Sequence, residues 1–312
     1  MPLTPFPDAE KYEFKEKFIE RYSKLTDWKT FKTYMLSFLR KSVRANTLKI
    51  SVKELCERLK HDWILEPVPW CDEGFWVEHK TGRLDVGNTV EHALGYYYVQ
   101  EAASMIPPLV LKPKTGETVL DIAAAPGSKA SQIAQYMRNE GAIVANDVKG
   151  ERLAALGINM QRMGVYNCVI TQMPGQAIKD VLFDKVLLDA PCSGVGTIRK
   201  SPKTIRMWNP NMIRRLSGLQ RKLIISAWNV LKPGGVLVYS TCSLEPEEDE
   251  AVVDFLLKNT DAKLEPIELK LKRGKPVTEF EGKTYSEEVK KCLRLWPQDN
   301  DTEGFFVARI RK

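Results

Sequence analysis

The chain has 312 residues and a mass of 35.5 kDa; 43% of its residues are hydrophobic and 28% are charged. These are ordinary values for a globular protein and exclude a mostly disordered chain, and the length predicts two domains, or one large and one small domain. The sequence contains no uncharged apolar run of ~18 residues and no secretory signal pattern, so we expect a cytoplasmic protein without a transmembrane helix.

In the first 111 residues the hydrophobic pattern predicts helix and then a small α+β module. Aromatic residues and leucines recur at three- and four-residue steps through residues 1–42, which predicts helix. A β–α–β–β run follows, and Ser51 is placed to cap its helix. A further helix is predicted over 98–111, and Pro107 and Pro108 are expected to end it early or kink it. The elements of the β–α–β–β run are predicted at 44–50, 51–60, 63–70 and 74–79.

From residue 118 onward, strands and helices alternate, which predicts a parallel sheet covered on both faces. At the end of the chain, 290–297 and 303–312 are strand-like runs joined by a polar turn, which predicts an antiparallel hairpin. Residues 259–291 are charged and weakly patterned, and we expect mixed loop and strand. The strands of the alternating part are predicted at 118–123, 142–146, 167–171, 184–189 and 235–240. Its helices are predicted at 128–138, 150–163, 210–231 and 247–258.

The charge distribution is more informative than the formal net charge of +7. From Ala190 to Leu244 the chain contains basic residues and no acidic one. A local positive field of this kind suits a polyanion such as RNA or DNA. The alternative is a solvated basic helix face without a partner. The basic residues are Arg199, Lys200, Lys203, Arg206, Arg214, Arg215, Arg221, Lys222 and Lys232.

The segment TVLDIAAAPGSKA predicts a ligand site, because an apolar strand ends in small residues, turns at Pro126-Gly127 and enters a helix at Ser128 or Lys129. Open α/β sheets bind ligands at the carboxyl ends of their strands, near helix N-termini. The motif is neither GxGxxG nor GxxxxGKS, so a nicotinamide dinucleotide and a P-loop nucleotide are disfavoured. A tight turn without a ligand is the alternative. The small residues that let a ligand approach the backbone are Ala123, Ala124, Ala125 and Gly127.

The next predicted strand ends at Asp147, where an acidic side chain can accept hydrogen bonds from ribose hydroxyls. Asp147 could instead be the N-cap of the helix that follows. Lys149 and Arg152 come next, at the start of that helix. Together the two motifs favour a nucleoside-type cofactor, and S-adenosylmethionine fits better than NAD because the glycine fingerprint is absent.

Two cysteines follow two predicted strands of the same sheet. Cys192 comes shortly after Asp189 at the end of one strand, and Cys242 directly follows the next strand. A single cysteine at a strand end is usually structural, but two at neighbouring ends, each followed by a serine, form a more specific pattern. We expect both thiols to face the cleft near the cofactor. The six cysteines and three histidines show no zinc-site spacing, so no metal and no disulfide framework is expected.

The sequence resembles the RNA cytosine-5 methyltransferases of the Sun/Nop/Nol group, and most of all the compact archaeal tRNA enzymes. The resemblance implies a Rossmann-like S-adenosylmethionine methyltransferase sheet, mostly parallel with a C-terminal antiparallel hairpin, over residues 95–312. It implies a helical plus small α+β, RRM-like, RNA-contacting module over 1–94. The matching segments are RANTLK (44–49), GYYYVQEAASMIPP (95–108), LDIAAAPGSK (120–129), LLDAPCSGVG (187–196), LKPGGVLVYSTCSLEPEED (231–249) and DTEGFFVARIRK (301–312).

In such an enzyme a thiolate adds to carbon 6 of cytosine and makes carbon 5 nucleophilic enough to accept a methyl group. Chemistry leaves open which cysteine attacks, and DNA cytosine methyltransferases use the reverse order. The resemblance implies Cys242 as the nucleophile, Cys192 as the residue that promotes release, and Asp189 as the group that holds the base. On this view we expect the two sulfurs to straddle one flipped pyrimidine next to the methyl donor. It also implies the cofactor residues Ala123, Ala124, Ala125, Pro126, Gly127, Ser128, Lys129, Asp147, Arg152 and Asp189.

Two positions depart from the family pattern. After the third strand the family usually has an acidic residue near the adenine, whereas this chain has Gln172 in the stretch TQMPG (171–175), so adenine recognition would fall to Gln172 or to backbone groups. Many members have a histidine where this chain has Gln298. Neither departure affects the two thiols.

For the RNA, residues 199–210 combine basic side chains with Trp208, which suits a phosphate track beside a stacking surface. Core packing is the alternative for Trp208. Arg44 and Lys49 of the N-terminal module are expected to add RNA contacts. tRNA is favoured by the resemblance, rRNA is the main alternative, and a catalytically silent RNA-binding relative or a small-molecule or protein methyltransferase is less favoured. The residues expected to bind the phosphates are Lys200, Lys203 and Arg206, together with Arg44.

Overall fold

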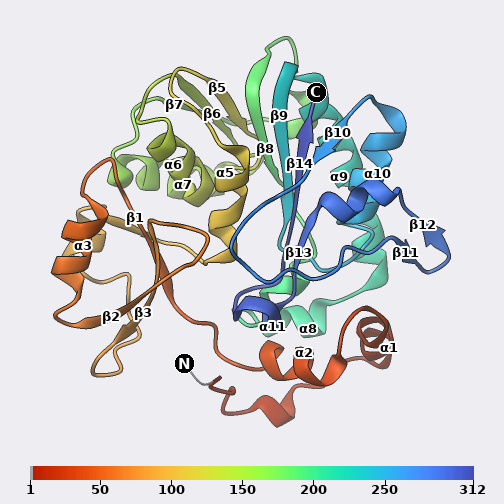
Figure 1. Cartoon of the computed structure of the whole chain (residues 1–312), viewed down its shortest axis with the longest axis horizontal. Helices are drawn as coiled ribbons and strands as arrows, with labels where there is room; N and C mark the ends of the chain where they lie inside the picture. Colours follow the sequence, from red (N-terminus) through yellow and green to blue (C-terminus); the bar gives the residue numbers. More distant parts are fainter. Residues whose placement is uncertain (1–2) are drawn as a thin grey trace. The chain divides into compact units, whose positions relative to one another are not determined.

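The computed structural model describes residues 3–312 (Figure 1). By its internal contacts the chain divides into two compact units. Unit 1 comprises the residues up to Arg40, Pro191–Arg221 and Ser240–Ala308. Unit 2 comprises Lys41–Ala190, Lys222–Tyr239 and Arg309–Lys312. This division does not follow the predicted boundary at residues 94–95, because the N-terminal helices group with unit 1 and the small α+β module groups with unit 2.

In unit 2 a four-stranded antiparallel sheet has the order β2-β3-β1-β4. Figure 1 labels three of its strands, β1, β2 and β3. Helix α3 (Val52–Leu59) begins where predicted, and the Ser51 hydroxyl accepts the Glu54 N–H at 3.2 Å. The predicted β–α–β–β run is therefore present, and β4 carries its sheet beyond residue 94. The strands are β1 (Ser42–Ala45), β2 (Trp63–Pro67), β3 (Gly74–His79) and β4 (Tyr97–Val99).

The predicted helix over 98–111 is wrong in its first half. Tyr98 lies in strand β4, where it pairs with Arg44 of β1, so long-range strand pairing overrides the local pattern. Helix α5 (Ile106–Leu111) starts later, and Pro107 and Pro108 stand in its first turn. The N–H groups of a first turn have no partner within the helix, so the prolines begin this helix rather than end it.

The large sheet has the order β10-β14-β9-β8-β5-β6-β7, and β13 pairs with β14. β5 pairs in parallel with β6 and β8, and β6 pairs in parallel with β7. β13 and β14 are antiparallel, with Leu293 opposite Val307, so the mostly parallel sheet with a C-terminal hairpin is confirmed. The strands are β5 (Thr118–Asp121), β6 (Ala142–Asn146), β7 (Cys168–Thr171), β8 (Phe183–Asp189), β9 (Leu231–Thr241), β10 (Lys263–Glu265), β13 (Leu293–Leu295) and β14 (Phe305–Arg311).

The helices between these strands lie close to their predicted ranges, because each has a long apolar pattern bounded by turn residues. No helix among residues 3–312 is long and apolar enough to span a membrane. The helices that follow β3 in the chain, apart from α5, are α4 (Val90–Ala93), α6 (Ser128–Tyr136), α7 (Gly150–Met163), α8 (Lys203–Met207), α9 (Pro210–Asn229), α10 (Glu250–Asn259) and α11 (Pro297–Asn300). Shorter elements are the 3-10 helices η1 (Ala9–Lys11), η2 (Ala103–Met105), η3 (Gly175–Ala177), η4 (Val195–Thr197) and η5 (Glu287–Lys291), and the strands β11 (Glu279–Phe280) and β12 (Lys283–Thr284).

At the N-terminus, in unit 1, the helix predicted over 1–42 is two helices, α1 (Glu16–Leu25) and α2 (Trp28–Met35). They are separated at Asp27, whose side chain accepts the Thr30 N–H at 2.9 Å and caps α2. Residues 1–2 of the prediction lie outside the described residues, and residue 42 begins β1.

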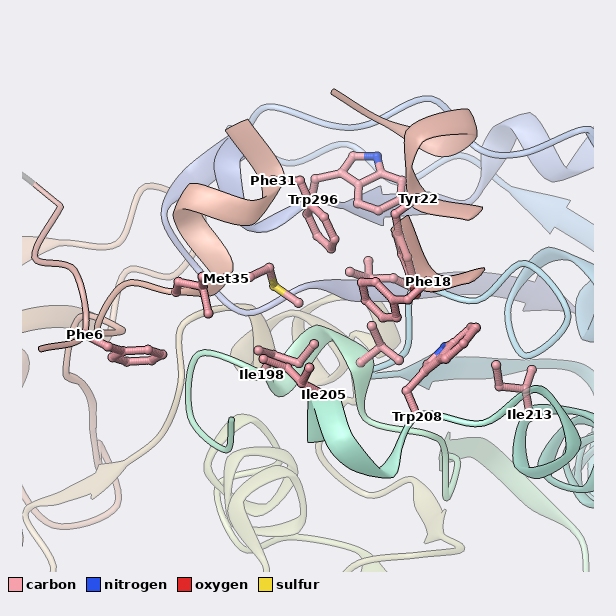
Figure 2. Packing of buried hydrophobic residues seen from close by; sticks show 13 residues of the cluster. Phe6, Phe18, Tyr22, Phe31, Met35, Ile198, Ile205, Trp208, Ile213 and Trp296 are labelled. Carbon is pink, nitrogen blue, oxygen red and sulfur yellow. The ribbon is translucent and has the colours of Figure 1, made fainter. Parts of the chain in front are cut away.

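The aromatic side chains of α1 and α2 face a buried core of unit 1 (Figure 2). The Tyr22 ring stacks on Phe31 with centroids 5.1 Å apart, and Phe18 meets Trp208 edge to face at 5.2 Å. Trp296 closes the cluster against Phe31 at 5.6 Å. This core binds the N-terminal helices to the segments that carry the two cysteines of interest.

Candidate active site

The two cysteines that follow β8 and β9 meet in unit 1. The Sγ atoms of Cys192 and Cys242 are 3.1 Å apart. A disulfide bond would be about 2.05 Å, so these are two free thiols within hydrogen-bonding distance. If either thiol ionises, the other S–H can donate to the thiolate and stabilise it. The separation leaves no room for a ring between the sulfurs, so the expectation that they straddle a pyrimidine is wrong.

A backbone contact at Gly196 holds the two cysteine segments together. The Gly196 N–H donates to the Cys242 carbonyl at 2.9 Å, and the Gly196 carbonyl accepts the Gly304 N–H at 3.0 Å. A Cβ on Gly196 would lie 2.1 Å from the Gly304 oxygen and 2.7 Å from the Cys242 oxygen. Only glycine fits there, because the obstructing atoms are backbone.

A buried carboxyl joins the residues that follow the two cysteines. Both oxygens of Glu248 accept the Ser193 N–H at 3.1 Å, and Oε2 also accepts the Ser193 hydroxyl at 2.6 Å. The Ser193 and Ser243 hydroxyl oxygens are 3.1 Å apart. Glu248 is fully buried, and burial raises its pKa to about 7. Sequence reasoning missed this residue, although the acidic run EPEED directly follows the Cys242 segment.

The turn after Cys242 is held by two buried arginines. Arg294 is fully buried and donates to Glu250 at 2.8 Å and to Asp249 at 3.1 Å. Arg21 of α1 donates to Glu245 Oε2 at 2.6 Å. Burial raises the pKa of both Asp249 and Glu245, and the arginine charges oppose that rise. Buried ion pairs of this kind constrain the geometry of the turn, whereas their net contribution to the free energy of unfolding is small.

Trp208 belongs to this buried network, which decides between its two predicted roles. It is only 2% exposed, and its indole N–H donates to Glu245 Oε1 at 2.7 Å. The Lys15 ammonium donates to its backbone carbonyl at 2.7 Å. The prediction of a stacking surface for RNA is therefore wrong, and the core-packing alternative is correct.

In unit 2, three neighbouring parallel strands each end at an aspartate. Asp121 ends β5, Asp147 directly follows β6, and Asp189 ends β8, so the three lie at one edge of the sheet. Asp121 is buried and faces the Ala123 amide, yet neither of its oxygens makes a hydrogen bond of good geometry within residues 3–312. Burial, reinforced by the Asp189 charge, raises the Asp121 pKa to about 7. Sequence reasoning missed Asp121, although it lies within the LDIAAAPGSK segment.

Two predicted cations pair with the other two aspartates. The Lys129 ammonium lies 2.7 Å from Asp189 Oδ2 and also donates to the Ser104 hydroxyl at 3.1 Å. Arg152 lies 3.1 Å from Asp147 Oδ2, and Asp147 Oδ1 accepts the Lys149 N–H at 3.0 Å. Lys149 is itself the N-cap residue of α7 and makes no side-chain cap, so Asp147 is not a conventional N-cap.

The turn between β5 and α6 has the predicted small-residue form. The Ala125–Pro126 peptide is cis, and Gly127 has φ of 105°. A Cβ on Gly127 would lie 2.6 Å from the Met160 Cε of α7. The φ of 105° by itself favours glycine at this position, because other residues rarely adopt it. The approach of a ligand to this turn stays a prediction. Of the other small residues, Ala124 and Ala125 are buried and Ala123 and Ser128 are half-buried.

The predicted RNA-binding residues divide into exposed and buried groups. Lys200, Lys203 and Arg206 are exposed. Arg44 is fully buried, donates to Gln100 at 2.8 Å, and has its pKa lowered by burial, so its predicted RNA contact is wrong. It also donates to Ser131 and Gln135.

Two other predicted positions have partners within their own units. The Lys49 ammonium donates to the carbonyls of Leu94 and Arg162 at 3.0 and 2.8 Å. Gln298 donates to the Thr26 hydroxyl at 2.8 Å. Gln172 is exposed, and its amide lies beside Gly150 in the first turn of α7, where a Cβ on Gly150 would be 3.0 Å from its Nε2. Because Gly150 is three positions after Asp147, Gln172 lies near Asp147 in unit 2.

Family comparisons cover nearly all of the chain. The family described as 16S rRNA methyltransferase RsmB/F matches residues 108–311, and the N-terminal domain of 16S rRNA methyltransferase RsmF matches residues 14–102. The chain is 52% identical over 308 residues to the tRNA (cytosine(49)-C(5))-methyltransferase of Pyrococcus abyssi, which covers 97% of this chain and 98% of that protein. It is 44% identical over 282 residues to ribosomal RNA small subunit methyltransferase F of Serratia proteamaculans, which covers 88% of this chain and 57% of that protein.

Solved structures match over the same extent. A methyltransferase homolog protein from Pyrococcus horikoshii superposes with a TM-score of 0.87 at 41% identity, over 98% of this chain and 99% of that chain. NSun6 from Pyrococcus horikoshii, solved with SFG, has a TM-score of 0.84 at 26% identity, over 96% of this chain and 99% of that chain.

Proposed function

Because the chain belongs to the RsmB/F family of S-adenosylmethionine-dependent RNA cytosine-5 methyltransferases, we propose that it methylates tRNA through a covalent cysteine–cytosine adduct. The near full-length match to a tRNA enzyme supports tRNA, whereas the chain spans only 57% of the rRNA relative named above. The observation that carries the covalent mechanism is the 3.1 Å separation of the Cys192 and Cys242 sulfurs.

The carboxylate edge of unit 2 fits the methyl donor. S-adenosylmethionine carries a sulfonium and an ammonium group, and when bound it supplies an electrophilic methyl group. Asp121 offers a buried carboxyl whose oxygens make no hydrogen bond of good geometry within residues 3–312, which suits a cationic group. Asp147 would accept from the ribose hydroxyls beside its ion pair with Arg152. Ala123–Lys129 would form the adjoining turn.

Cys242 then acts as the nucleophile. Its thiolate, formed by loss of the thiol proton to solvent, forms a bond to carbon 6 of cytosine. The electron pair of the C5–C6 double bond moves to carbon 5, which takes the methyl group as the methyl–sulfonium bond breaks and leaves a neutral thioether. Cys192, which has by then lost its own proton to solvent, takes the hydrogen of carbon 5 as a proton, the double bond reforms, and the S–C6 bond breaks with its electrons returned to Cys242. Asp189, held by Lys129, can accept from the exocyclic amine of the base. The target cytosine has to leave its stack for this chemistry.

Single alanine variants test the order of the two thiols. Cys242→Ala is expected to abolish methylation without an adduct, and Cys192→Ala to accumulate a protein–RNA band that survives denaturation. The assay mixes each variant with RNA and S-adenosylmethionine and separates the products on a denaturing gel. An adduct in Cys242→Ala but not in Cys192→Ala would reverse the roles.

The RNA substrate is tested by bisulfite sequencing. A mixture of tRNA and rRNA is incubated with the protein and S-adenosylmethionine, and protected cytosines are read in both. New protection confined to tRNA is the expected result, and protection confined to rRNA would refute the tRNA assignment while leaving the chemistry intact.

A further inference from the structure

Unit 1 contains a cavity of about 860 Å³ that neither cysteine of the thiol pair lines. Its walls come from α1, α9, α10 and the β11–β12 hairpin. This volume is in the range of sites that hold a nucleotide-sized ligand. The wall formed by α9 comes from the middle of the acid-free segment noted in the sequence, so the cavity gives a location to basic residues that the thiol site does not use.

Two donors in the walls have no partner within residues 3–312. The Nε of Arg221 and the hydroxyl of Tyr285 are both buried and make no hydrogen bond there. Buried polar groups are almost always hydrogen-bonded, so two such donors in one cavity point to a ligand that supplies acceptors. The Arg221 guanidinium also lies over the Phe255 ring, 5.4 Å from its centroid, and offers a flat cationic surface.

The charges facing the cavity favour an anion. Three acidic residues of the wall are already engaged, since Glu247 and Glu281 bind Arg21, and Asp254 lies 2.7 Å from Lys258. Glu20 is the remaining acidic residue among those that line it. Several basic residues of the wall make no ion pair in the described part of the chain. These are Lys17, Lys24, Arg214, Arg221 and Lys283.

We propose that this cavity is a second RNA subsite, which binds a nucleotide of the substrate other than the target cytosine. Arg221 and Tyr285 would donate to its phosphate, and its base would stack on the Arg221–Phe255 surface. A phosphate ester of this kind belongs to an RNA strand or to a free mononucleotide, and we assign it to RNA because the proposed function supplies that substrate. The inference rests on the proposed function in this respect alone.

Gly218 gives a way to fill the cavity without changing its charge. It lines the cavity from α9, and a Cβ there would meet no atom within 4 Å. Gly218→Leu is expected to raise the Kd for a tRNA transcript about fivefold or more, the effect of losing one stacked base. Its thermal stability should not fall, because leucine favours helix over glycine. Gly157→Leu on α7 is the matched control, since a Cβ there meets only Ile170 at an ordinary 3.9 Å.

A charge series on the same helix tests the phosphate contact. Arg214→Gln with Arg221→Gln removes two charges that line the cavity, and Arg215→Gln with Lys222→Gln removes two that do not line it. The slope of log Kd against log salt should fall by about 1 to 2 more in the first pair, because each phosphate contact contributes about 0.7–0.9. Tyr285→Phe should weaken binding while leaving thermal stability unchanged or higher, since its hydroxyl has no hydrogen-bond partner among residues 3–312.

Each variant is titrated with a tRNA transcript and with cytidine monophosphate, and methylation is measured separately. Weaker tRNA binding in the cavity variants, with unchanged binding in their matched controls, supports the proposal. Unchanged tRNA binding with weaker mononucleotide binding would refute the RNA assignment in favour of a free nucleotide. Unchanged binding of both would refute the subsite. Absence of tRNA methylation by the unmodified protein would count against the proposed function and not against the cavity.

Discussion

Glu248→Gln tests whether the buried carboxyl positions the two thiol segments. Glu248 accepts from both the N–H and the hydroxyl of Ser193, and an amide in its place presents its own N–H groups to one of those donors. Above pH 7, where Glu248 is ionised, losing its buried, charge-assisted bond costs about 1.5–3 kcal/mol. If that energy holds the thiols in their reactive arrangement, kcat falls about tenfold to a hundredfold.

The pH dependence of stability is a second readout. The Glu248 pKa rises from an ordinary 4.5 to about 7 in the folded protein. Between these pH values the folded protein keeps a proton that the unfolded chain has released, so the free energy of unfolding falls as pH rises. The fall is about 1.4 kcal/mol per pH unit and about 3 kcal/mol across the window. Glu248→Gln lacks this dependence, so it should gain about 3 kcal/mol relative to the unmodified protein between pH 4.5 and pH 7.

Urea unfolding at several pH values and single-turnover methylation measure the two effects. Glu268→Gln, an exposed carboxyl of the same unit, is the control and should track the unmodified protein in both. Parallel stability curves for Glu248→Gln and the unmodified protein would refute the raised pKa. A stability difference of the expected sign with unchanged kcat would refute the positioning role.

Three further variants test the other contacts. Gly196→Ala should cost about 1–3 kcal/mol in thermal unfolding and abolish adduct formation, because its Cβ meets the Gly304 and Cys242 carbonyls. Arg44→Met should cost about 2–4 kcal/mol in unfolding by leaving buried acceptors unpaired, yet leave the salt dependence of RNA binding unchanged. Joint replacement of Lys200, Lys203 and Arg206 by glutamine should lower the slope of log Kd against log salt by about 2 to 3, and an unchanged slope would remove them from the interface.

The sequence was sufficient for the large sheet because its strands are apolar runs bounded by glycine, aspartate or proline. β6 and α7 have the predicted bounds, and β8 differs by one residue. The wrong predictions lie where the structure depends on contacts between segments that are distant in the sequence. Tyr98 joined a strand because β1 was available to pair with it, and no local pattern carries that information. The break at Asp27 was not predicted, because the aromatic periodicity continues on both sides of it.

The basic residues of the predicted RNA site also differ in ways that the sequence does not show. Arg44 and Lys200 look alike as sequence, but Arg44 is fully buried on Gln100 whereas Lys200 is exposed. Arg21 reaches Glu245 across 224 positions of sequence, so its structural role could not be read from its neighbours. A charged side chain reveals its role only through its partners, and these are set by the tertiary fold.

The closeness of the two sulfurs constrains the proposed reaction. A base cannot lie between atoms 3.1 Å apart, so both thiols must approach the pyrimidine from one face. Carbons 5 and 6 are bonded neighbours, so a sulfur next to the one bonded to carbon 6 can reach carbon 5. The methyl group then arrives from the opposite face and turns the hydrogen of carbon 5 toward the thiols, where Cys192 can take it. The 3.1 Å separation of the sulfurs therefore has two consequences for the proposed reaction. It excludes a base between the sulfurs, and it keeps Cys192 close enough to Cys242 to accept the proton of carbon 5.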